Sequence, residues 1–117
     1  MAAMTKKQFA KFLARDFNRC WHCGASDETL VGQHRKGRQM GGSKSATTNG
    51  TANIIVFCSE ANGRLESDAA FAKVARSKGW ALNSWQTPDS VPVFDVVSQC
   101  WYQLDDLFGR VVCEQGL

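Results

Sequence analysis

One histidine stands where a strand-like run, residues 28–34, breaks into a basic, glycine-rich loop, within the stretch VGQHRKGRQMGGSK. An imidazole near its unperturbed pKa can take or give a proton at neutral pH. Cations around it attract a polyanion, and here His34 is followed by Arg35, Lys36, Arg38 and Lys44. The combination indicates proton chemistry performed next to phosphate.

The charge of the chain is divided unevenly. Residues 1–64 carry ten Lys or Arg against four Asp or Glu, whereas residues 65–117 carry four against seven. The basic half also holds the unusual motifs, which predicts a nucleic acid as a partner, although solvated helices can carry such charge without any ligand.

The length of 117 residues predicts one domain, residues 1–117, with a modest core. No apolar run approaches the roughly 18–20 residues of a membrane span, so no membrane partner is expected. The start, MAAMTKKQFAKF, lacks the apolar segment of a signal peptide. We therefore expect a cytoplasmic protein whose five cysteines are reduced or metal-bound.

Periodicity and turn signals predict the elements that position these residues. A helix should run from an N-cap at Thr5 to about Arg19, with Arg15 on its solvent side. A tight knuckle at 20–24, a strand at 28–34, a loop at 35–52 and a buried strand at 53–58 should follow. The remainder predicts a helical stretch, a further helix from about residue 67 to Gly79, and short strands from residue 91 onward.

The order is strand, long loop, strand, helix, with His34 ending the first strand, Asn53 opening the second and Asn62 in the first turns of the helix. This arrangement resembles the HNH endonuclease family, whose ββα-metal fold holds one divalent cation between a hairpin and a helix. The match spans about residues 20–66, and QHRKGRQMGGSK is most similar to the small HNH proteins of bacteriophages.

The resemblance implies an α+β fold: a ββα-metal core with an N-terminal helix and a C-terminal helix plus a small β-hairpin. It implies hydrolysis of DNA phosphodiester bonds with Mg²⁺ or another divalent cation, by nicking, leaving a 5′-phosphate. His34 would be the general base. Asn53 would orient it through the loop or the imidazole, and Asn62, in place of the family's final His, would offer an oxygen to the metal.

The position before the base departs from the family, which commonly has Asp or His there as a metal ligand. Gln33 is neutral and a weaker ligand. Glu66 lies four residues after Asn62, so both face the same way on a continuous helix. Glu66 is therefore the favoured charged ligand, with Glu60 behind it and a purely solvent-facing Glu66 as the alternative.

The cysteines depart as well. Many HNH proteins hold a structural Zn²⁺ with two Cys-x-x-Cys pairs. Cys20, Cys23 and Cys58 match three of these positions, but the fourth falls at Ala61. Either zinc takes a fourth ligand from His22, Cys100 or Cys113, or the knuckle is degenerate and its cysteines pack as small apolar residues. Cys100 and Cys113 are otherwise expected in the core.

Phosphate contacts are predicted for the cations beside the base and on the helix: Arg35, Lys36, Arg38, Lys44 and Arg64. The alternative is a solvated loop. A rival function keeps the same frame as a catalytically weak DNA-binding module, accessory to a phage packaging or recombination complex. Gln33 favours the rival, whereas the retained His34, Asn53 and Asn62 favour the enzyme.

Overall fold

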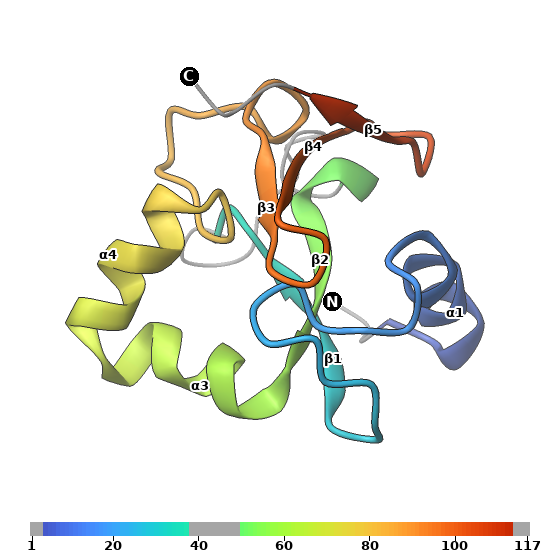
Figure 1. Ribbon diagram of the computed structural model, residues 1–117, viewed down its shortest axis with the longest axis horizontal. Coiled ribbons are helices and arrows are strands. Elements are labelled where there is room, and N and C mark those ends of the chain that lie inside the picture. The colour runs from blue at the N-terminus through green and yellow to red at the C-terminus, as the bar shows by residue number, and fades with distance from the viewer. Residues whose placement is uncertain (1–3, 38–49, 114–117) are drawn as a thin grey trace.

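Three α-helices and two antiparallel sheets form the described part of the chain, residues 4–37 and 50–113, in the computed structural model (Figure 1). The α+β class is as predicted. None of the helices within these residues is long and apolar enough to cross a membrane. The elements in chain order are α1 (Lys6–Arg15), β1 (Leu30–His34), the 3₁₀ turn η1 (Thr51–Asn53), β2 (Ile54–Cys58), α3 (Ser59–Ser67), α4 (Ala69–Ser77), the 3₁₀ turn η2 (Pro88–Ser90), β3 (Val93–Asp95), β4 (Cys100–Leu104) and β5 (Arg110–Cys113).

Helix α1 begins at the predicted cap but ends early. The Thr5 hydroxyl accepts from the Gln8 backbone N–H while the Gln8 side chain accepts from the Thr5 N–H, a capping box. The helix stops at Arg15 because Phe17 and Asn18 take positive φ angles of 58° and 54°. The predicted extension to about Arg19 is therefore wrong.

Arg15 is also not on the solvent side as predicted. Its side chain is buried, and its guanidinium contacts the Asp16 carboxylate at 2.7 Å and donates to the carbonyl of Thr51 at 2.8 Å. The Asp16 carboxylate in turn accepts from the backbone N–H of Val56 at 3.0 Å. This buried ion pair joins the end of α1 to the hairpin.

Strands β1 and β2 form an antiparallel hairpin that is covered on both faces. The register pairs Gln33 with Ile55 and His34 with Ile54, and each residue of β2 is buried. Ile55 and Phe57 belong to the core beneath α3 and α4, whereas Ile54 and Val56 pack under α1. Figure 1 shows α1 on one side of the hairpin and α3 and α4 on the other.

Arg35, the residue after the end of β1, is a buried cation with several hydrogen-bond partners. Arg35 is 1% exposed, and its guanidinium donates to four backbone carbonyls at 2.6–2.9 Å, those of Gly79, Ala52, Pro88 and Val91. Burial lowers the pKa of Arg35 to about 9, with a further contribution from the Arg15 cation, so the group is still charged at neutral pH. A guanidinium enclosed in this way has no route to a phosphate, which corrects the prediction that Arg35 contacts nucleic acid.

The end of α4 is fitted to this cation. Gly79 takes the left-handed φ of 75° that stops the helix, and a Cβ there would meet the carbonyl oxygen of Pro92 at 2.0 Å. The backbone therefore needs glycine here. Its own carbonyl accepts from Arg35 at 2.8 Å.

The C-terminal region is a three-stranded sheet in the order β3-β4-β5 rather than the small hairpin predicted. Its β4–β5 turn reaches back to the start of β2. The Asp106 carboxylate accepts from the Ala52 N–H at 3.0 Å, and the Thr51 hydroxyl donates to the Asp105 carbonyl at 2.9 Å. The turn thus fixes the residues immediately before Asn53.

Replacing Arg35 with Met should lower the free energy of unfolding by about 3 kcal/mol or more, because four buried carbonyls lose their donor. Urea denaturation followed by circular dichroism measures this. Lys73→Met, at an exposed position of α4, is the control and should change stability by less than about 0.5 kcal/mol. Equal stability of the two variants would contradict the structural role of Arg35.

Candidate metal centre and hairpin site

The predicted knuckle is a tight turn that brings its cysteines back toward the hairpin. The Cys20 N–H donates to the Ala25 carbonyl at 2.8 Å, and the Gly24 N–H donates to the Cys20 carbonyl at 2.9 Å. Gly24 has a φ of 79°, and a Cβ at this position would meet Cγ2 of Val97 at 2.7 Å. The Cys-x-x-Cys-Gly pattern is thus explained by this turn and its close neighbour.

Four side chains from this turn and from the end of β2 converge. The ligand atoms of Cys20, His22, Cys23 and Cys58 all lie within 4.8 Å of one another. Cys23 and Cys58 have their Sγ atoms 3.7 Å apart, and backbone N–H groups of His22 and Cys58 donate to Cys20 Sγ at 3.3 and 3.2 Å. Three thiols and an imidazole at this spacing could hold a metal ion with tetrahedral geometry.

His22 is the member that supplies a nitrogen. Its ring packs edge-on against Phe71 and Trp80, with centroids 5.0 and 5.3 Å away, and lies 5.9 Å from the Phe57 ring. Burial, and then the Arg64 cation, lower the pKa of His22, so the imidazole is neutral at pH 7. Its Nδ1 atom is buried and has no hydrogen-bond partner among the described residues. A neutral imidazole with an unbonded nitrogen fits a metal ligand.

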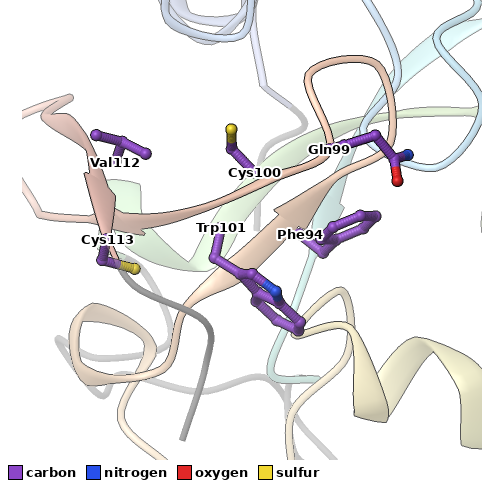
Figure 2. Close-up of a pocket in the computed structure, with 6 residues that line it drawn as sticks. All are labelled: Phe94, Gln99, Cys100, Trp101, Val112 and Cys113. Carbon is purple, nitrogen blue, oxygen red and sulfur yellow. The ribbon is translucent and has the colours of Figure 1, made fainter.

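The alternatives for the fourth ligand lie elsewhere. Cys100 and Cys113 line a separate pocket of about 410 Å³ on the β3-β4-β5 sheet. Figure 2 shows the Cys100 thiol and the Trp101 side chain on opposite sides of their strand, with Cys113 on the neighbouring strand. Both cysteines are partly exposed rather than in the core as expected.

The buried thiols of the cluster are protonated without a metal. Burial raises the pKa of Cys20 to about 12 and also raises that of Cys58. A bound metal would displace these protons, because thiolate is the ligand form.

At the other end of the hairpin, Asn53 binds the residues that follow His34. The Asn53 side chain accepts from the Lys36 N–H at 2.7 Å and donates to the Lys36 carbonyl at 3.0 Å. Its own carbonyl accepts from the Arg35 N–H at 2.7 Å. Asn53 is fully buried, so it fixes the backbone after His34 without contacting solvent.

The register separates two of the predicted site residues. Gln33 lies opposite Ile55, on the face beneath α3, whereas His34 lies opposite Ile54, on the face beneath α1. Paired residues of a hairpin share a face. The structure therefore does not place His34 on the face that α3 covers.

The Gln33 amide is committed to the interior. The side chain is 3% exposed, and its Nε2 donates to the Trp80 carbonyl at 2.7 Å. Its Oε1 is buried and has no hydrogen-bond partner in the described part of the chain. Gln33 thus connects β1 to the residue that packs on His22, and it does not offer an open ligand to a hydrated cation.

The other predicted ligands lie on α3. Asn62 is half-buried, and Glu66 and Glu60 are exposed. Their oxygens are the hard donors that Mg²⁺ prefers, and α3 continues from Ser59 to Ser67, so Asn62 and Glu66 share a helix face.

The predicted phosphate-binding residues have different surroundings. Lys36 is partly buried, with its backbone bonded to Asn53. Arg64 forms an ion pair with Asp68 at 3.5 Å and covers the Phe71 ring at 4.2 Å. Arg38 and Lys44 lie outside the described residues.

Comparison with protein-family models, with curated proteins and with solved structures found no match to this chain. The assignment of a function therefore depends on the geometry of these residues.

Trp80 is the residue of this region that the sequence analysis missed. Its ring packs on His22 and on Phe57, its Nε1 donates to the Phe94 carbonyl at 2.8 Å, and its carbonyl accepts from Gln33. No local pattern in the sequence indicates such a junction. The position of His22 within Cys-x-x-Cys was a usable signal for the fourth ligand.

Cys23→Ser and His22→Ala should each lower the bound metal and the melting temperature, because a tetrahedral site loses one of its ligands. Elemental analysis of protein purified without chelator, and the thiolate charge-transfer absorption of the Co²⁺-loaded protein, measure the effect. Cys100→Ser is the matched control and should retain the metal content of the unsubstituted protein. Metal-free protein with full stability would show that the cysteines only pack.

Proposed function

We propose that the protein is a metal-dependent endonuclease of the HNH type that hydrolyses phosphodiester bonds in DNA. The observation that carries the proposal is the pair of hydrogen bonds from the Asn53 side chain to Lys36, two residues after His34. A backbone held by hydrogen bonds at this point is what a general base at the end of β1 requires. The sequence β1, β2, α3 supplies the frame in the same order as the family resemblance.

In this proposal His34 takes a proton from the attacking water, and Asn53 holds the backbone that carries the imidazole. Lys36 and Arg64 position the phosphate without reading sequence. Asn62 and Glu66 would hold the divalent cation, which polarises the phosphoryl oxygen when bound. Because the register places His34 opposite Ile54, the proposal requires the imidazole to reach the α3 side from the end of β1. Gln33 has no part in binding the cation in this proposal, because its side chain is buried away from the solvent that would carry a hydrated cation.

The cluster of Cys20, His22, Cys23 and Cys58 is proposed as a structural Zn²⁺ site. Its donor set of three sulfurs and one nitrogen is one that zinc accepts in closed, tetrahedral sites. His22 supplies the ligand that Ala61, a buried residue of α3, lacks. The role of this metal would be to fix the knuckle against the end of β2.

His34→Ala should reduce the rate of supercoiled-plasmid nicking by about 10²–10⁴-fold, because the general base is removed. DNA affinity should persist, since the phosphate contacts remain. Gel quantification of nicked plasmid with Mg²⁺, and with the chelated cation as control, measures the rate. An unchanged rate would remove His34 from the mechanism.

Glu66→Gln should raise the Mg²⁺ concentration needed for half-maximal nicking, because the only carboxylate assigned to the cation loses its charge. Glu60→Gln is the matched control, an exposed carboxylate on the same helix. A metal titration that shifts equally in both variants, or in neither, would exclude Glu66 as a ligand.

A second candidate function is a catalytically weak DNA-binding module on the same frame. The burial of Gln33 favours it, because the position next to His34 then provides no open ligand. This function predicts DNA binding with no metal-stimulated nicking by Mg²⁺ or Mn²⁺.

A further inference from the structure

Trp85 is exposed to a degree unlike the other tryptophans of the chain. Its exposed fraction is 79%, whereas Trp21 and Trp80 are 1% and 3% exposed, and Trp101 packs on Phe94 at 5.3 Å. Burying an indole normally provides a large part of a core's stability. This indole is instead open to a ligand.

The turn that presents Trp85 is held at its base. The Asn83 N–H donates to the Gln86 side-chain oxygen at 2.7 Å, and the Gln86 N–H donates to the Asn83 carbonyl at 3.0 Å. These bonds close the chain on either side of Trp85. The indole is thus offered from a defined turn rather than from an unrestrained loop.

Both ends of this segment are bonded to the residue that follows His34. The Leu82 N–H donates to the Arg35 carbonyl at 2.7 Å, and the Arg35 guanidinium donates to the Pro88 carbonyl at 2.9 Å. Lys36 and Leu82 also form a parallel β-bridge. Trp85 therefore lies on a loop, between α4 and β3 (Figure 1), that is anchored to the two residues following the proposed general base.

The neighbours of Trp85 indicate what it binds. The residues around it in sequence are polar, and no other large apolar side chain between residues 82 and 91 is exposed. A protein-docking or membrane-binding surface would group several apolar side chains. Exposed cations precede the segment on α4, at Lys73 and Arg76, and a carboxylate, Asp89, follows it.

We propose that Trp85 is a stacking platform for an unpaired base of a nucleic acid held at the hairpin site. This inference rests on the proposed function. It adds that the protein prefers a substrate strand with unpaired nucleotides next to the scissile phosphate. A flat aromatic ring stacks on any base, so the contact tolerates sequence while it selects against fully paired DNA.

Binding of a fluorescein-labelled single-stranded oligonucleotide, and of the matching duplex, tests the proposal in buffer without added divalent cation. Trp85→Ala should weaken single-strand binding about ten-fold, with a smaller effect on the duplex. Trp85→Phe should retain most of the affinity because a ring remains. Leu107→Ala, at an 88% exposed position in the β4–β5 turn, is the control and should bind as the unsubstituted protein does.

A second readout uses the indole itself. Unlabelled single strand should quench the tryptophan emission, and Trp85→Phe should abolish that quenching while binding persists. Unchanged affinity in Trp85→Ala, or quenching that survives in Trp85→Phe, would overturn the stacking role. Plasmid nicking that continues in those variants would then leave the endonuclease in place, whereas absence of both binding and nicking in the unsubstituted protein would remove the two proposals together. Concentration-dependent self-association that is lost in Trp85→Ala, seen by sedimentation, would assign the indole to a protein contact and also overturn it.

Discussion

The arrangement of the chain depends on one cation that is removed from water. The guanidinium of Arg35 joins the entry to β2, the end of α4 and the segment before β3, through carbonyls of Ala52, Gly79, Pro88 and Val91. A buried charge is costly unless its hydrogen-bonding groups are satisfied. Each of these backbone segments is therefore held where its carbonyl oxygen can reach the cation.

The candidate metal centre and the hairpin site share structural support through Trp80. Its indole packs on the ring of His22, and its carbonyl accepts from Gln33, the residue before His34. The two sites lie at opposite ends of the hairpin, one at Cys58 and the other at His34. Trp80 therefore contacts both regions, through its indole on one side and its backbone carbonyl on the other.

Local patterns were enough to predict β2, the cap of α1 and the stop at Gly79. The convergence of Cys58 with Cys20 and Cys23 was one of two alternatives, and it came from the family resemblance rather than from a local pattern. Local patterns failed for cations, because whether Arg35 or Arg15 is buried depends on carbonyls and carboxylates brought together by tertiary structure. A positive charge beside a histidine in the sequence predicts a phosphate contact whether the cation is buried or exposed. The separation of Gln33 and His34 onto different faces depends on the register with β2, which periodicity alone leaves open.

The partners of Arg35 also impose an order on the production of the protein. A ribosome releases this residue well before Gly79, Pro88 and Val91, which follow it by 44, 53 and 56 positions. Until those positions emerge, the cation stays hydrated and the hairpin beside it lacks the carbonyls that enclose it. The first half of the chain therefore cannot enclose Arg35 until the second half has been synthesised. Shortened products that end before residue 91 lack some of these carbonyls, so we expect them to be cleaved more readily by proteases.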